Sequence, residues 1–191
     1  DAWQIESVAL AKLRRKLTDG RKTLKEVYGS PCRGVVTGLN EAFVVDRATR
    51  DRLIAEHAHS AELLKPFLKG ADDVAKWRIE GGEQWLIYIP KGKLSINDFP
   101  AVKAHLLPFK DKLEQRATQQ AWFELQQPQE AYISDFNGGK LVFPEMSQGP
   151  KFALDETGFF LLNKLFYVPK IDWFLLGLMN SKSVWAFLFG I

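Results

Sequence analysis

The histidine and cysteine side chains that can take part in catalysis do not form a recognised set in this sequence. His57 and His59 are two residues apart, and on a helix this spacing points them in different directions, which disfavours a zinc site built on the pair. We interpret them as solvated residues near a helix end. Cys32 has no sequence signature of a nearby base and is interpreted as a small buried thiol in a strand. His105 lies between apolar positions of a predicted helix, which is typical of a core or boundary residue rather than a general base.

Patterns that bind phosphate or metal ions are also absent from the sequence. The glycines do not fall into a GxGxxG or GxxxxGK[ST] loop. Asp72 and Asp73 can hold a cation, but Lys69 and Lys76 beside them favour an exposed turn of mixed charge. Because each common catalytic class leaves no pattern, the sequence favours binding over catalysis. We predict no catalytic residue, no metal ligand and no cofactor in this chain.

The composition is that of an ordinary globular domain. With 191 residues there is room for one full-sized domain, and 46% hydrophobic with 26% charged residues argues against extended disorder. A net charge of +3 permits nucleic-acid binding without identifying it. The single cysteine excludes an internal disulfide and is consistent with a reducing compartment. Residues 171–191 are apolar, but residues 180–183 interrupt them well short of the ~20 residues that span a bilayer, so we expect a soluble cytoplasmic protein with no membrane partner.

The first residues predict an amphipathic helix. Trp3, Leu10, Leu13 and Leu17 recur on one helical stripe, and residues 19–20 end it. The rest of the chain predicts short strands between helical segments. Strands are expected at 35–36, 43–45, 85–89, 140–143, 151–154 and 159–162. Helical segments are expected at 46–57, 61–68, 100–116 and 172–179, with a restart after residue 180 toward 189.

Glycine and proline define the boundaries of these elements. Residues 38–40 suit a tight turn between the first two strands. Asn97 or Asp98 is expected to cap the helix that begins near Pro100, and Pro108 implies either a kink or two helices in sequence. The order of elements predicts an α+β fold, with a small mixed twisted sheet or half-barrel of short strands, helices at its margins and the amphipathic helix in front.

Several segments, taken in order, resemble one protein family. They are RGVVTGLNEAFVVD (33–46), LLKPFLKGADDVAKWRI (63–79), FPAVKAHLLPFKDKLEQRA (99–117), the aromatic pair Trp122-Phe123 with Leu125, KLVFPEMSQGPKFALDETG (140–158) and FLLGLMNSKSVWAFL (174–188). Together they resemble the TaqI-like C-terminal specificity domain, the target-recognition domain of adenine-specific DNA methyltransferases and type II restriction-modification enzymes. The resemblance covers most of the chain from residue 33 onward.

The resemblance implies a division of the chain and of the reaction. Residues 1–30 would be a helical connector from a catalytic domain elsewhere in the parent protein, and residues 31–191 the DNA target-recognition domain, truncated inside its last helix. The family's catalytic half carries a glycine-rich S-adenosylmethionine loop and an Asn-Pro-Pro-Tyr motif, and this sequence has neither. Cofactor binding and flipping of the target adenine are therefore expected in that other domain. The expected partners of this chain are double-stranded DNA and the catalytic domain, with no small-molecule substrate.

Under this interpretation, the basic and amide side chains near predicted turns have two separate roles, phosphate contact and base recognition. Phosphate contacts, which supply affinity and its salt dependence, are assigned to Lys65, Lys69, Lys140 and Lys151. Arginine can bridge two guanine acceptors and asparagine can pair with adenine, so base reading is assigned to Arg33, Asn40 and Arg78, with Thr37 as a helper. Trp122 is a candidate for stacking or wedging, with core packing as the alternative. The lysines can equally be ordinary solvated residues, and the arginines can pair with nearby acids.

Two other classes of function remain open at this point. The aromatic side chains and the broken C-terminal helix are compatible with a protein-interaction module that docks a partner subunit. The scattered acids are compatible with a metal-dependent nuclease or other hydrolase. Salt-dependent binding to duplex DNA separates DNA recognition from protein docking.

Overall fold

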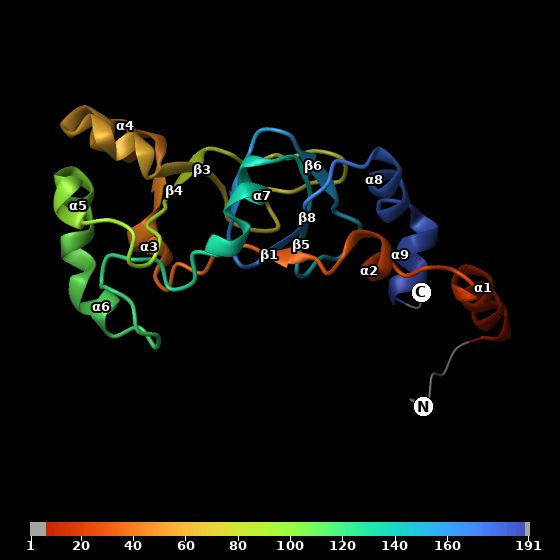
Figure 1. Ribbon diagram of the computed structural model, residues 1–191. Helices are drawn as coiled ribbons and strands as arrows, with labels where there is room; N and C mark the ends of the chain where they lie inside the picture. The colour runs from red at the N-terminus through yellow and green to blue at the C-terminus, as the bar shows by residue number, and fades with distance from the viewer. Residues whose placement is uncertain (1–6, 190–191) are drawn as a thin grey trace.

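Helices and short strands alternate along an elongated molecule in the computed structural model, which describes residues 7–189 (Figure 1). The helices are α1 (Val8–Thr18), α2 (Leu24–Tyr28), α3 (Asn40–Phe43), α4 (Arg47–Glu56), α5 (Pro100–Leu106), α6 (Lys110–Glu114), α7 (Ile133–Asn137), α8 (Trp173–Met179) and α9 (Lys182–Phe189). The strands are β1 (Cys32–Arg33), β2 (Val44–Asp46), β3 (Leu64–Leu68), β4 (Gln84–Ile87), β5 (Lys140–Pro144), β6 (Ala153–Asp155), β7 (Phe160–Leu161) and β8 (Leu165–Val168). Trp3, the expected start of the first helix, lies outside the described residues.

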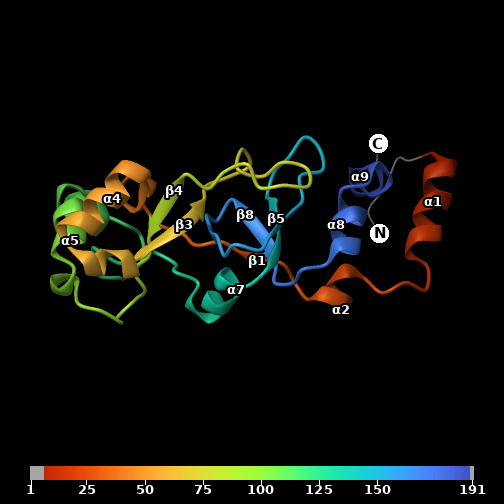
Figure 2. The same cartoon turned by 90° about the horizontal axis from the view of Figure 1, so that it is seen from above.

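The strands form two open sheets in the middle of the molecule. One sheet has the order β1-β8-β5-β6 and is antiparallel throughout, and the other has the order β2-β4-β3-β7 with one parallel pair, β3 with β7. Helices α4, α5 and α6 lie at one end, and α1, α2, α8 and α9 lie at the other, as two perpendicular views show (Figures 1 and 2). The expected α+β class, with short mixed strands, marginal helices and a leading amphipathic helix, is confirmed. Neither sheet closes into a barrel.

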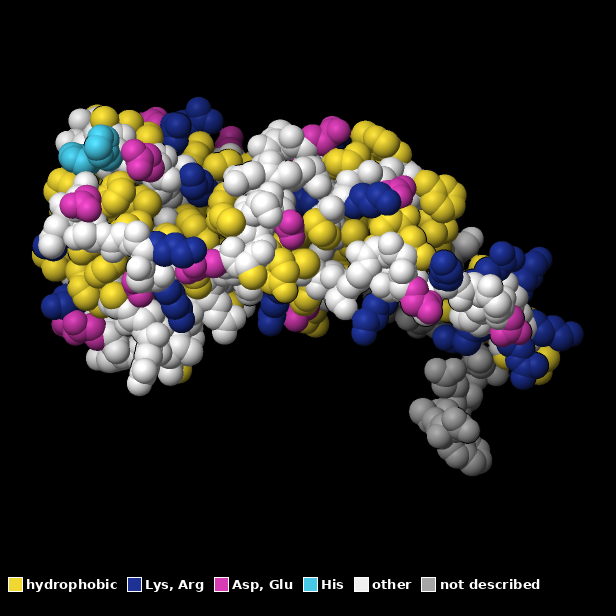
Figure 3. All heavy atoms as spheres, viewed as in Figure 1, with side chains coloured by type: hydrophobic (Ala, Val, Ile, Leu, Met, Phe, Trp, Pro, Cys, Tyr) yellow, Lys and Arg dark blue, Asp and Glu magenta, His cyan; other side chains and the backbone are white. Residues whose placement is uncertain are grey.

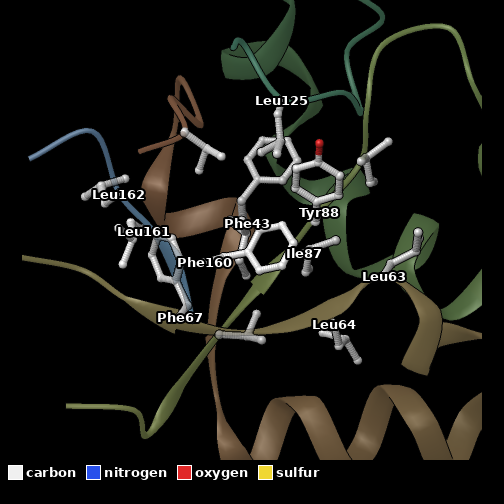
Figure 4. Close-up of a cluster of buried hydrophobic side chains, with 14 of the residues drawn as sticks. Phe43, Leu63, Leu64, Phe67, Ile87, Tyr88, Leu125, Phe160, Leu161 and Leu162 are labelled. Carbon is white, nitrogen blue, oxygen red and sulfur yellow. The ribbon is translucent and has the colours of Figure 1, made fainter. Parts of the chain in front are cut away.

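One hydrophobic core spans both sheets. Figure 4 shows the side chains of Phe43 at the end of α3, Tyr88 directly after β4 and Phe160 of β7 converging on one another. The ring of Phe160 lies 5.1 Å from Tyr88 and stacks at 4.9 Å on Phe136 of α7, and Phe136 lies 5.4 Å from Tyr167 of the first sheet. This run of aromatic rings holds the two sheets together, because each pair adds to the burial of large apolar surfaces.

A smaller cluster joins α8 to the first sheet. Leu175 and Leu176 of α8 pack with Leu141, Phe152 and Val168. The predicted helix break at Asn180 is confirmed, since α8 ends at Met179 and α9 begins at Lys182. The fully buried Asn180 amide donates to the Phe152 carbonyl at 2.8 Å and its oxygen accepts the Phe152 amide at 3.2 Å. Asn180 therefore fixes the helix break to Phe152, the residue directly before β6.

The sequence prediction is wrong at two places where distant strands determine the local conformation. Residues 61–68 were expected to be helical, but Leu64–Leu68 is strand β3, paired with β4 on one side and β7 on the other. Lys65 precedes Pro66, and a residue in that position is biased toward extended backbone. Residues 40–43 form the short helix α3 instead of completing a hairpin turn, and β2 pairs with β4.

The segment around Pro108 forms two helices, α5 and α6, joined by a 3-10 turn, which is one of the two predicted outcomes. The predicted cap is wrong. Phe99 occupies the N-cap position of α5 without a side-chain bond, while Asn97 and Asp98 belong to a preceding 3-10 turn. The Asn97 amide oxygen instead accepts from the Lys103 ammonium at 2.9 Å. Among residues 7–189, no helix has the length and apolar character needed to cross a bilayer.

Candidate nucleic-acid interface

The two polar residues assigned to the first loop, Thr37 and Asn40, lie side by side. The Thr37 hydroxyl donates to the Asn40 side-chain oxygen at 2.6 Å. Thr37 is only 2% exposed, so its hydroxyl is not open to a direct contact with a base edge and meets the Asn40 side chain instead. Asn40 is exposed at the first residue of α3. Its amide remains able to meet a base edge, since the amide oxygen has a second lone pair.

The two arginines assigned to base reading lie on the surface beside acids. Arg33 Nε donates to the Asn163 carbonyl at 2.7 Å, and the guanidinium lies 3.4 Å from Glu145. Arg78, with 75% of its side chain exposed, pairs with Glu80. Exposed ion pairs of this kind contribute about 0–1 kcal/mol. A phosphate or a guanine edge can therefore displace the acid at little cost.

The structure contradicts the phosphate contact that was assigned to Lys140. Its side chain is completely buried, and its ammonium lies 2.7 Å from Asp155, whose side chain is completely buried as well. It also donates to the Phe136 carbonyl at 2.8 Å. Burial lowers the pKa of the Lys140 amine, and the partner carboxylate opposes that shift. A lysine sealed inside the fold cannot reach a phosphate, so this assignment is wrong.

The other three assigned lysines have different surroundings. Lys69 is exposed, and Lys65 is half-buried on β3 beside a hollow of about 360 Å³. The Lys151 ammonium donates to the Ala71 carbonyl at 2.9 Å and so ties residues 69–83 to the first sheet. Lys69 remains the best placed of them for a phosphate contact.

A hollow of about 630 Å³ gathers several charged residues of the 69–84 segment. Lys69, Glu80 and Lys164 line it, and Arg33 is held on Asn163, next to Lys164 in the chain. The lining also contains the acids Asp72, Asp73, Glu80 and Glu83, so its charge is mixed. Asp73 is engaged in structure, because it accepts the backbone amides of Lys69 and, at 3.1 Å, Gly70. Within residues 7–189 no three His, Cys, Asp or Glu residues are placed to hold a metal ion.

Trp122 lies half-buried against the core rather than projecting. It packs on the main hydrophobic cluster and meets Phe123 edge to face at 5.7 Å. The Lys110 ammonium lies 5.9 Å from the Trp122 ring. The core-packing alternative fits this geometry better than stacking on a base.

An amide-rich loop, residues 115–129, is the main feature that the sequence interpretation missed. It carries six glutamines, at positions 115, 119, 120, 126, 127 and 129. Glutamine can pair with adenine through two hydrogen bonds, so this density of amides was the available signal. In Figure 1 the loop hangs below α6, and Figure 3 shows that uncharged polar surface dominates there.

Arg116 holds this loop in one conformation. Its guanidinium donates to the carbonyls of Thr37 (2.9 Å), Trp122 (2.8 Å) and Glu124 (2.8 Å), and Nε donates to Leu113 at 2.8 Å. Burial lowers the pKa of Arg116, and the nearby Glu124 opposes that shift. The rigid fork of an arginine suits several carbonyls at once. Arg116 thus joins the amide-rich loop to residue 37, beside Asn40.

Gly38 allows the two loops to approach each other. Its φ is +80°, and a Cβ atom there would lie 2.5 Å from Arg116 and 2.8 Å from the side-chain oxygen of Gln126. Only glycine fits this position without displacing the Arg116 contacts. The exposed Asn40 and the glutamine-rich loop therefore belong to one surface.

Basic side chains also concentrate at the opposite end of the molecule. Helices α1 and α2 and the segment between them carry exposed cations, visible as dark blue side chains at the right of Figure 3. They are Lys12, Arg15, Lys16, Arg21, Lys22 and Lys25. No residue of α1 or α2 is fully buried, although Tyr28 of α2 packs against the smaller hydrophobic cluster.

Comparison with solved structures shows a likeness of fold. No family model matches the chain. The fold is shared with a restriction-modification enzyme. The type IIL restriction-modification enzyme MmeI, solved in complex with DNA, superposes with a TM-score of 0.58 at 16% sequence identity. The match covers 80% of this chain and 20% of MmeI, so the chain corresponds to about a fifth of that enzyme's length.

Proposed function

We propose that this chain is the sequence-specific, double-stranded DNA recognition module of a restriction-modification enzyme. The observation that carries the proposal is the fold shared with a fifth of MmeI, an enzyme whose structure contains DNA. The ordered segments that resemble the TaqI-like specificity domain support the finer assignment. In that assignment this module selects the sequence, and a separate catalytic domain methylates the target adenine with S-adenosylmethionine.

The proposal assigns affinity and discrimination to different parts of the surface. Exposed lysines such as Lys69, together with the cations of α1 and α2, would neutralise phosphates and supply salt-dependent affinity. Asn40, Arg33 and Arg78 would read base edges. The glutamine-rich loop held by Arg116 lies next to Asn40 and adds amides suited to adenine.

Protein docking is a second candidate function, favoured by one specific observation. On α8, Trp173, Phe174 and Leu178 are 66%, 77% and 38% exposed. Exposed apolar side chains grouped in this way favour a protein contact. The catalytic domain of the parent protein is the partner that we propose for this surface.

Binding to labelled, mixed-sequence duplex DNA at several salt concentrations tests the main proposal. We expect affinity to fall steeply with salt, with a slope of about −0.9 for each phosphate that is neutralised. A flat response to salt would contradict DNA recognition and favour the docking function. Incubation with duplex DNA and magnesium should leave the DNA intact, whereas cleavage would favour the hydrolase alternative.

Two substitutions test the division of labour once a preferred sequence has been selected. Arg78→Ala should relax the preference at one base position, at about 1–3 kcal/mol of discrimination. Lys69→Gln should weaken binding to all DNA sequences by the same factor and reduce the magnitude of the salt slope by about 1. If both substitutions weaken binding to every DNA sequence equally, the separation of base reading from phosphate contact is wrong.

A further inference from the structure

Trp77 is a bulky side chain on a backbone conformation that normally requires glycine. Its φ is +81°, in the left-handed region, and the residue is 50% exposed. Within residues 7–189 the only other non-glycine residue with a positive φ is Gln129, in the amide-rich loop. A tryptophan is strained there, and exposure means that core packing does not compensate for the strain. Strained residues of this kind cluster at functional sites.

The loop beneath Trp77 is fixed to the first sheet. The Trp77 backbone amide donates to the Phe152 carbonyl at 3.0 Å, and the Ala75 amide donates to the Arg78 carbonyl at 3.0 Å, which closes the turn. Lys151 adds the bond to Ala71 described above. The indole is therefore presented from a turn held by backbone hydrogen bonds, which limits the conformational entropy that it would lose on binding.

Cations flank the exposed ring on both sides in the sequence. The Lys76 ammonium lies 5.3 Å from the centroid of the Trp77 ring. Arg78 pairs with the exposed acid Glu80. An aromatic ring between two cations matches a nucleic acid, in which bases offer flat faces and the backbone offers phosphates.

We propose that Trp77 stacks on a base of the bound duplex, entering at a base step that it helps to open, while Lys76 contacts the adjacent phosphate. This inference rests on the proposed function and extends it. Aromatic and apolar side chains that enter between base pairs kink the duplex and favour steps that unstack easily. Trp77 would thus contribute to the choice of sequence through DNA deformability, beside the arginine and amide contacts.

Trp77→Gly separates a stacking role from a structural one, because glycine removes the ring and relieves the backbone strain together. We expect mixed-sequence duplex DNA to bind this variant about tenfold to a hundredfold more weakly, the loss typical of one base–aromatic stack. The salt slope should stay unchanged, since no cation is removed. The melting temperature should stay equal or rise. Trp77→Phe, which keeps a ring, should retain most of the affinity.

Tyr132→Ala is the matched control, because Tyr132 is also an exposed aromatic residue but lies in the 3-10 turn before α7. Its affinity for the same duplex should equal that of the unsubstituted chain. Equal DNA binding by the unsubstituted chain and Trp77→Gly contradicts this proposal alone. A fall in melting temperature for Trp77→Gly contradicts it too, because it would show that the ring packs. If the unsubstituted chain does not bind duplex DNA, the proposed function itself fails.

Discussion

At the scale of single residues, the contrast between Lys140 and Lys69 shows how burial decides the role of a charge. Both are lysines close to strand ends, and sequence alone gives them the same phosphate-contact role. Lys69 stays exposed, while Lys140 is buried with Asp155. Asp155 also accepts the amides of Thr157 and Phe159 at 2.9 and 2.8 Å, so it organises the turn after β6. The Lys140–Asp155 pair is part of the core. Its loss should lower the stability of the fold rather than act directly on the affinity for DNA.

Lys140→Met should lower the free energy of unfolding by about 3–5 kcal/mol, because it leaves the Asp155 carboxylate buried without its countercharge. Urea unfolding measures the change. Lys164→Met, at an exposed lysine, is the control and should stay within about 0.5 kcal/mol of the unsubstituted chain. The folded fraction of Lys140→Met should bind DNA with an unchanged salt slope. A variant that folds normally but binds DNA with a smaller slope would restore the phosphate role to Lys140.

At the scale of elements, Arg116 makes an irregular loop into a defined surface. Residues 115–129 contain one isolated bridge residue, Gln127, and no strand or helix of their own. Several of their carbonyls accept hydrogen bonds from a side chain instead of from secondary structure. The same guanidinium reaches residue 37, so two loops distant in sequence are fixed together. This explains how glutamines without a helix or strand can keep a constant arrangement.

Arg116→Lys should loosen this loop while keeping the positive charge. An ammonium cannot reproduce the planar fork, so some buried carbonyls lose their donor and the free energy of unfolding should fall by about 1–3 kcal/mol. Limited proteolysis should show new cleavage between residues 115 and 127. Arg52→Lys, at an exposed pair with Glu56, should change neither property. If Arg116→Lys is as resistant to proteolysis as the unsubstituted chain, the loop is held by other contacts.

At the scale of the whole molecule, the two sheets behave as one body because an aromatic run crosses between them. Phe160 belongs to the second sheet, yet its ring stacks on Phe136, which in turn meets Tyr167 of the first. The loop that contains Asn40, the amide-rich loop and the Trp77 turn all extend from this shared core. A binding surface that draws residues from both sheets needs such a rigid connection.

Phe160→Ala should therefore destabilise both sheets together. We expect a loss of about 3–5 kcal/mol in the free energy of unfolding, since the residue is 1% exposed and leaves a cavity between two rings. Thermal unfolding followed by tryptophan fluorescence and by far-ultraviolet circular dichroism should give one coincident transition. Met146→Ala, at an 83% exposed side chain, is the control with an unchanged midpoint. Two separate transitions in the Phe160 variant would show that the sheets fold independently.

Local sequence signals determined those elements whose cause lies within a few residues. The local sequence predicted α4, α8 and the break at Asn180, and Pro108 predicted either a kink or the division that separates α5 from α6. The α+β class followed from the alternation of short strands and helices. The resemblance of ordered segments suggested a restriction-modification enzyme, and the chain shares the fold of part of one such enzyme, MmeI.

Only the tertiary structure decided which polar side chains are available to a partner. Nothing near Lys140 in the sequence indicates Asp155, and nothing near Trp77 indicates that its amide bonds to Phe152. Strand β3 likewise forms because β4 and β7 supply partners for its backbone. Burial, ion pairing and strand pairing depend on residues far away along the chain. Local pattern can therefore identify residue types suited to DNA, whereas the packing of the whole chain selects those that reach the surface.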